Sequence, residues 1–195
     1  MNILKEIKTA LILTLVLAAV CCGLYPLAVT GVGQLLFSKQ ANGSLLKDKS
    51  GAVIGSALLG QNFNGDTYFN PRPSAAGTAG YDPTGSSGTN YGPTSQKLID
   101  SIKQRVSDYR KANNLPDNQL VPADAVTSSA SGLDPHISVK NALLQLPRVA
   151  EKRGLPVEKL RALVESHTDG RFLGVLGEPG VNIVTLNLAL DGKIE

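Results

Sequence analysis

One uncharged apolar segment near the N-terminus constrains this chain more than any other feature. From Thr9 to Ser38 no side chain is charged, and the first half of the segment consists almost entirely of good helix formers. A helix needs about 20 apolar residues to cross a bilayer, because each residue advances it by about 1.5 Å. The sequence therefore predicts a short leader at 1–9, a transmembrane anchor at 10–37 and a soluble domain at 38–195.

The composition of this segment also predicts its shape. Pro26 is expected to kink the helix, and Gly31 with Gly33 is expected to end it. Small side chains recur four positions apart, which would let a partner helix approach closely, although small side chains that simply face lipid fit equally well. These small residues are Ala18, Ala19, Cys22 and Gly23.

A cleaved signal peptide is the alternative interpretation of the segment. Lys5 and Lys8 precede an apolar run that reaches Cys22, as in a secretory signal. The apolar character then resumes after Pro26 and continues to Phe37, which is longer than the roughly 7 to 15 residues of a signal peptide's apolar region. Retention as an anchor is the better interpretation.

The orientation of the anchor follows less directly from charge. Lys5 and Lys8 lie before the span, whereas Lys39, Lys47 and Lys49 lie after it, so the count of basic residues nearly ties. The short leader is typical of a signal anchor, which leaves the N-terminus in the cytoplasm. We therefore expect the large domain on the outer face of the membrane.

Composition excludes several classes of function for the domain. Both cysteines, Cys21 and Cys22, lie in the apolar segment, so the domain has no thiol for a disulfide, a zinc site or a nucleophile. The chain has no Trp, only 5% aromatic residues and no cluster of Lys and Arg, although its net charge is +3. A nucleic-acid partner therefore has little support.

The pattern of the domain predicts an α+β fold. Residues 52–60 indicate one or two short strands, and 181–190 a strand that runs into a short helix. Helical periodicity follows a cap at Thr94 or Ser95, recurs over 138–153, and starts again at Pro156. Pro147 is expected to kink or split the second of these helices. Together these elements predict several helices and a modest sheet in one domain.

A region rich in Gly, Pro, Ser and Asn separates the first strands from the first helix. From Gln61 to Pro93 its length and composition would fit a disordered linker. Disordered linkers lack aromatic residues, however, and this region contains several. We therefore expect an ordered loop region, which its rings fix to the domain: Phe63, Tyr68, Phe69, Tyr81 and Tyr91.

Enzymatic machinery is hard to find in the sequence. His136 and His167 have no metal-ligand spacing and no cysteine to join them, so we expect lone surface histidines. The segment from Thr127 to Asp134 offers hydroxyls and backbone N–H groups for an anion or a partner loop, or simply a turn that caps the next helix. Arg72, between two prolines, suits a carboxylate, backbone carbonyls or a structural ion pair.

An ordered set of short motifs points to one family. Each motif is weak alone, but in order they cover nearly the whole chain, and on them the chain resembles the C subunit of the bacterial Kdp potassium-transporting P-type ATPase. The motifs are Tyr25-Pro-Leu27, Gln40-Ala-Asn-Gly-Ser44, Gly55-Ser-Ala-Leu-Leu-Gly-Gln-Asn-Phe63, Tyr68-Phe69, Arg72-Pro-Ser74, Ser129-Ala-Ser-Gly-Leu-Asp134, Gln145 with Pro147-Arg-Val-Ala150, Val181-Asn-Ile-Val184 and Leu186-Asn-Leu-Ala-Leu-Asp191.

The resemblance implies an accessory subunit of an ATP-driven potassium importer, not an enzyme by itself, in the bacterial cytoplasmic (inner) membrane. Its implied partners are a channel-like subunit, the catalytic P-type ATPase subunit and membrane lipid. It also implies a catalytic chaperone that raises the ATP affinity of the catalytic subunit, with ATP shared and no tightly bound cofactor, catalytic residue or metal. The candidate nucleotide or partner contacts are Gln61, Asn62, Phe63, Arg72, Ser129, Ser131, Gly132, Asp134, Gln145 and Arg148.

Two alternatives to the chaperone role stay open. A domain on the outer face cannot touch cytoplasmic ATP, so it would act as an external cap or brace over the ion entrance. If the N-terminal segment were cleaved, the remaining chain would instead be a secreted protein such as a hydrolase.

Overall fold

The structure is a computed structural model that describes residues 3–194. The chain forms two compact units, which divide between Ser44 and Leu45. The first unit is helical and the second contains all the strands, so the predicted α+β fold behind one N-terminal apolar helix is confirmed.

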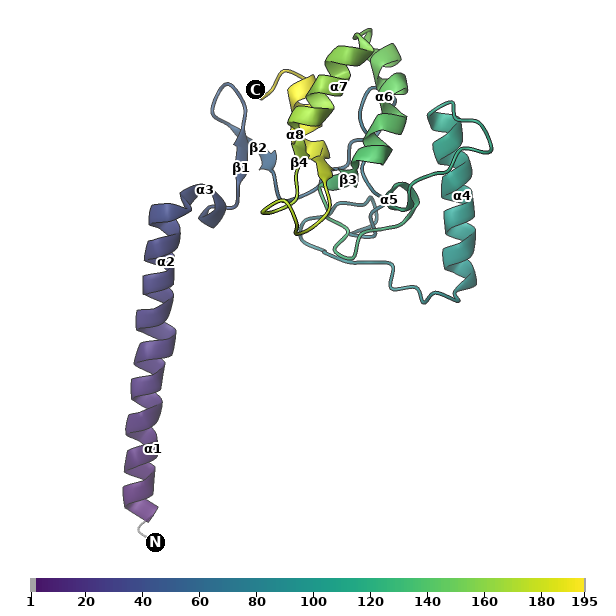
Figure 1. Cartoon of the computed structure of the whole chain (residues 1–195). Coiled ribbons are helices and arrows are strands. Elements are labelled where there is room, and N and C mark those ends of the chain that lie inside the picture. The colour runs from purple at the N-terminus through teal and green to yellow at the C-terminus, as the bar shows by residue number, and fades with distance from the viewer. Residues whose placement is uncertain (1–2, 195) are drawn as a thin grey trace. The chain divides into compact units, whose positions relative to one another are not determined.

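The first unit is dominated by one helical run from Ile3 to Leu36, which by length and composition is able to cross a membrane. None of its residues is buried. At about 1.5 Å per residue, its 34 residues extend for roughly 50 Å, well beyond the hydrocarbon core of a bilayer. The run comprises α1 (Ile3–Ala18), a π-helical stretch (Ala19–Leu24) and α2 (Tyr25–Leu36), followed by the short α3 (Ser38–Ala41) (Figure 1).

One expectation about this helix is wrong, whereas the kink expected at Pro26 stays a prediction. The helical run continues through Pro26, because the preceding turn widens to i→i+5 bonding, with the Tyr25 N–H donating to the Val20 carbonyl. Pro26 lies in the first turn of α2, where the N–H that proline lacks would not be needed for a hydrogen bond within the helix. The helix also passes through Gly31 and Gly33 and ends at Leu36. The small residues predicted for helix packing lie on this exposed run around the π-helical stretch: Ala18, Ala19, Cys22 and Gly23.

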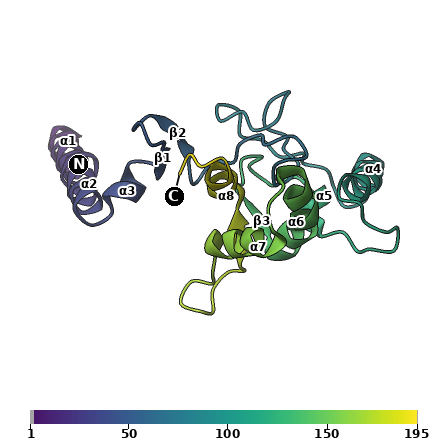
Figure 2. The ribbon, with the colours of Figure 1, turned by 90° about the horizontal axis from the view of Figure 1, so that it is seen from above.

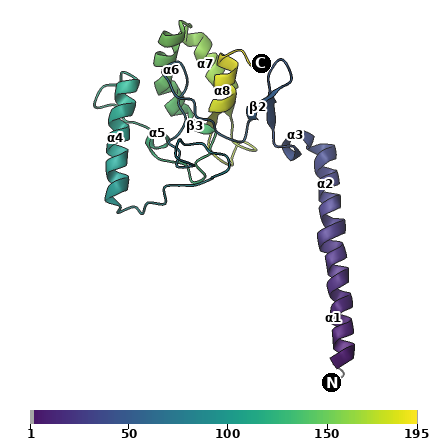
Figure 3. The ribbon, with the colours of Figure 1, turned by 180° about the vertical axis from the view of Figure 1, so that it is seen from behind.

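The second unit contains two small antiparallel sheets and five helices within the described residues. One sheet is the hairpin β1–β2, and the other has the order β3–β5–β4 (Figure 1). Figure 3 shows α6, α7 and α8 close together. The helix α4 lies away from these three and contacts α5. The elements are β1 (Leu45–Lys47), β2 (Val53–Ser56), α4 (Gln96–Ala112), α5 (Ala123–Val126), β3 (His136–Ser138), α6 (Val139–Arg153), α7 (Val157–Ser166), β4 (Thr168–Asp169), β5 (Gly180–Asn182) and α8 (Ile183–Leu190).

The core lies where α6, α7 and α8 meet the three-stranded sheet. Its largest fully buried apolar side chains include Leu146, Leu160 and Leu186. Of the kink or split expected at Pro147, the split is wrong, because α6 is continuous through this residue. Pro147 lies on the exposed face, where water can bond the carbonyl that its missing N–H leaves free, while Leu146 and Val149 stay packed in the core.

The loop region between β2 and α4 is ordered, as its aromatic content predicts. Phe69 is fully buried in the core, and its backbone is held at both ends by one side chain. The Phe69 N–H donates to Asn187 Oδ1 at 3.0 Å, and Asn187 Nδ2 donates to the Phe69 carbonyl at 2.9 Å. Tyr91 differs from the other predicted rings, since 45% of it remains exposed.

Candidate functional site

The segment from 127 to 134 is interwoven with the glycine-rich loops, although Ala130 and Ser131 remain exposed. Ser74 Oγ donates to the Gly132 carbonyl at 2.6 Å, and the Ser87 N–H donates to the Ser131 carbonyl at 2.9 Å. Ser129 and Gly132 are buried. The segment does not cap the following helix either, because Ser138 fills that position and accepts from the Asn141 N–H.

Arg72 forms the ion pair that its setting between prolines favours. Its Nη1 lies 2.9 Å from Asp134 Oδ2, at the end of the interwoven segment. The Asp134 carboxylate also accepts from the His136 backbone N–H at 3.0 Å, and His136 Nε2 lies 2.8 Å from Asp169 Oδ2. Four charged or titratable groups thus connect the loops to β3 and β4.

These contacts shift the pKa values of Asp134 and His136 in opposite directions. Burial alone would raise the pKa of Asp134, but hydrogen bonds from His136 and Arg72 outweigh burial and lower that pKa to about 2. The interaction of the His136 side chain with Asp134, with Asp169 on the other side, raises the pKa of His136 above its ordinary value. The arrangement holds Asp134 ionised and favours a protonated His136, as expected of a structural ion-pair network.

The histidines differ from the lone surface residues that the sequence suggested. The His136 ring lies between two carboxylates, with Nδ1 3.7 Å from Asp134 Oδ1 and Nε2 2.8 Å from Asp169 Oδ2. His167 is half-buried, with Nδ1 3.1 Å from Thr185 Oγ1, and burial lowers its pKa. The error arose because the partners lie 18 and 33 residues away in the chain, beyond any local spacing pattern. Within residues 3–194 no three His, Cys, Asp or Glu side chains form a group that could hold a metal ion.

A second network surrounds Arg148 on the buried face of α6. Arg148 is only 4% exposed, and burial lowers its pKa. All five of its N–H groups have neutral acceptors, which come from α6, from the end of α4 and from the loop on both sides of Phe69. These acceptors are Asn113 Oδ1 at 2.9 Å, the Gly65 carbonyl at 3.4 Å, the Asp66 carbonyl at 2.6 Å, Asn70 Oδ1 at 3.0 Å and Gln145 Oε1 at 2.9 Å.

Gln145 extends this network toward α4 and α5. Its Nε2 donates to Asn141 Oδ1 at 2.9 Å, which also accepts from the Tyr109 hydroxyl at 2.8 Å. Asn141 Nδ2 in turn donates to Asp124 Oδ2 at 2.9 Å. Sequence reasoning missed Asn141, Tyr109 and Asp124, because they lie on three separate helices and nothing local in the sequence links them.

The remaining candidates lie in a third place, near β2. Gln61 Nε2 donates to the Ile54 carbonyl at 3.0 Å, and Asn62 Nδ2 donates to the Ala79 carbonyl at 3.1 Å. Phe63 packs against the core with its ring centroid 5.5 Å from that of Tyr68. The ten candidate contacts therefore lie in three places in the domain. Asn70 joins the third place to the Arg148 network, because its Nδ2 donates to the Phe63 carbonyl at 3.0 Å and its Oδ1 accepts from Arg148.

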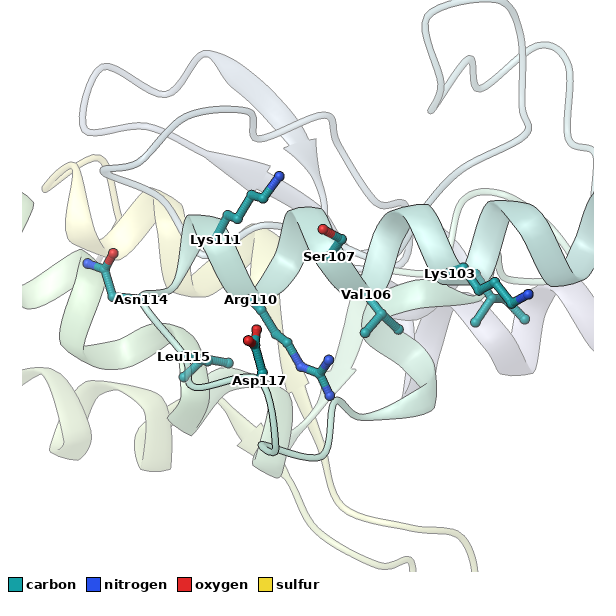
Figure 4. Close-up of a pocket in the computed structure, with 9 residues that line it drawn as sticks. Lys103, Val106, Ser107, Arg110, Lys111, Asn114, Leu115 and Asp117 are labelled. Atoms are coloured by element: carbon teal, nitrogen blue, oxygen red, sulfur yellow. The ribbon is translucent and has the colours of Figure 1, made fainter.

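Two hollows in the domain bear on ligand binding. One of about 250 Å³ is lined by Asn62, Arg72 and Tyr81 among others, so it includes two of the candidates. Another of about 490 Å³ lies along α4, where Figure 4 shows Arg110 extending from the helix toward the loop that carries Leu115 and Asp117. None of the ten candidates lines this second hollow.

Gly132 gives a test of how tightly the interwoven segment is packed. Its φ is +68°, and an added Cβ would lie 2.6 Å from the Ser87 carbonyl oxygen and 2.9 Å from the Ala76 backbone nitrogen. Gly132→Ala should lower the free energy of unfolding by about 2–4 kcal/mol, from backbone strain and overpacking together. Gly154→Ala is the matched control, because its φ is +63° with nothing within 4 Å, so we expect about 1 kcal/mol. Equal losses in denaturant unfolding of the two variants would contradict this packing.

Comparison with known proteins now decides the family. A family model described as KdpC, the c chain of a K⁺-transporting ATPase, matches residues 7–192. The chain belongs to the KdpC family. A Potassium-transporting ATPase KdpC subunit of Mycobacterium tuberculosis is 56% identical over 187 residues, covering 96% of this chain and 98% of the relative. One of Geobacter sulfurreducens is 46% identical over 188 residues, with the same two coverages.

The KdpC match includes most of the apolar helix as well as the domain. A third relative, the KdpC subunit of Rhodopseudomonas palustris, is 51% identical over 199 aligned residues, which cover 96% of this chain. The motif order that suggested the family from sequence is therefore confirmed.

Proposed function

We propose that this KdpC chain is an accessory, non-catalytic subunit of an ATP-driven potassium import complex in the bacterial cytoplasmic membrane. Its helix would anchor it beside the channel-like and catalytic subunits, and its domain would brace the assembly on the outer face. One observation carries the proposal: the Ile3–Leu36 helix has no buried residue and so has its whole apolar surface available for lipid and partner helices.

The catalytic-chaperone role is the second candidate, because the family resemblance implies it. It requires side chains that are free to contact ATP on the cytoplasmic side. Gln145 and Arg148 are 1% and 4% exposed, and Arg148 already uses every N–H within the domain. Arg72 is already paired with Asp134 at 2.9 Å, so the charge of this guanidinium is balanced by a carboxylate within the domain. These contacts favour the brace over direct nucleotide binding.

The side of the membrane that the domain occupies separates the two candidates. We would introduce Leu120→Cys, which is 73% exposed, into a Cys21→Ser/Cys22→Ser background, and Lys5→Cys as the matched control on the leader. A membrane-impermeant maleimide should label position 120, and not position 5, in cells whose inner membrane is intact. Labelling at position 5 alone would overturn the outer-face brace and favour the chaperone.

N-terminal sequencing of the same purified protein tests the remaining alternative. We expect the leader to be present. A mature start near residue 23 would identify a secreted protein and remove the anchor from the proposal.

A further inference from the structure

The loop between β4 and β5 carries four large apolar side chains that face solvent. We call residues 171–178 the apolar hairpin. Scattered exposed apolar residues are ordinary on a soluble surface, but four within five consecutive positions form a patch typical of an interaction site. The exposed fractions are 69% for Phe172, 78% for Leu173, 71% for Val175 and 58% for Leu176.

Hydrogen bonds fix the shape of the apolar hairpin. The Phe172 N–H donates to the Leu176 carbonyl at 2.8 Å, and the Leu176 N–H donates back to the Phe172 carbonyl at 3.0 Å. Arg171 Nη2 and Glu178 Oε2 close its base at 2.8 Å. A segment already fixed in one conformation loses little entropy when a partner binds it. Figure 2 shows this yellow-green loop, which follows α7 along the chain, projecting from the domain.

The charges around the apolar hairpin indicate whether its binding partner is a lipid surface or a protein. Lipid-binding loops and helices combine apolar residues with Lys or Arg that attract anionic headgroups. From Thr168 to Gly180 the charged residues are Asp169, Arg171 and Glu178, so the segment carries a formal charge of −1. The single cation is already paired with Glu178. This charge pattern disfavours an anionic bilayer and suits an uncharged protein cleft.

We propose that the apolar hairpin inserts into an uncharged apolar cleft on another subunit of the same transport complex. This inference rests on the proposed function, since it names the surface through which the domain braces its partner. The side chains at the tip would be the central buried anchors of the interface, and the Arg171–Glu178 pair would lie at its polar rim.

Photo-cross-linking of the full-length chain in membranes that contain the complete complex tests the proposal. Leu173 would be replaced by the photoreactive benzoylphenylalanine, with Leu120, an isolated residue of similar exposure at 73%, as the matched control. We expect irradiation to give an adduct between position 173 and a subunit of the complex, identified by mass spectrometry, with little adduct at position 120. Adducts with lipid alone, or no excess over position 120, would overturn the protein cleft.

A second variant separates failure of this inference from failure of the proposed function. Leu173→Ser/Val175→Ser should reduce co-purification of the complex by about tenfold or more while the unfolding midpoint of the chain stays unchanged. If the unaltered chain co-purifies and the double variant does so equally well, the hairpin interface is wrong but the subunit role stands. If the unaltered chain itself fails to co-purify, the proposed function is wrong.

Discussion

Replacing Arg148 by Ala is expected to lower the free energy of unfolding by about 3–5 kcal/mol. Arg148 is 4% exposed, and its guanidinium joins α6, the end of α4 and the loop on both sides of Phe69 through five hydrogen bonds. Its removal leaves several buried acceptors without donors and opens a cavity between these elements. Arg148→Lys should also cost stability, because one ammonium with three donors cannot replace the planar fork.

The matched control for this prediction is Arg161→Ala on α7. Arg161 is 45% exposed in its side chain and makes only a 4.0 Å contact with Glu158, so we expect a change within about 0.5 kcal/mol. Denaturant unfolding of the full-length protein in detergent, followed by circular dichroism, measures both variants. Similar midpoints for the two would show that the buried network contributes little.

Local patterns predicted the helices and the ordered loops well. The apolar run, the stripe after Ser95 and the strand that leads into the last helix all depend on spacing within one element, which a sequence shows directly. The helices also continue through two prolines for local physical reasons. Pro26 and Pro147 lie where the missing hydrogen bond could be replaced, by a π-helical turn in one case and by solvent in the other.

The candidate site was predictable only in part. The pairing of Arg72 with a carboxylate followed from a guanidinium fixed between prolines, but its partner Asp134 is 62 residues away. The bonds between Asn187 and Phe69 span 118 residues and those between Arg148 and Asp66 span 82, so no spacing pattern could indicate them. The family motifs marked these residues as important, and the structure shows that they bond to one another within the domain.

The central claim is that the apolar helix is part of the subunit's function as well as its attachment. Residues 1–38 would be deleted in one variant and replaced by an unrelated single span of equal length in another. The replacement controls for loss of membrane attachment and of export, because it restores both. It also replaces the predicted helix-packing residues: Ala18, Ala19, Cys22 and Gly23.

Co-purification of the transport complex from cells that depend on it for potassium uptake is the most direct measurement. We predict that the deletion abolishes both co-purification and uptake, and that the unrelated span restores membrane attachment but not full assembly. Unchanged assembly and potassium uptake after deletion of residues 1–38 would contradict the account.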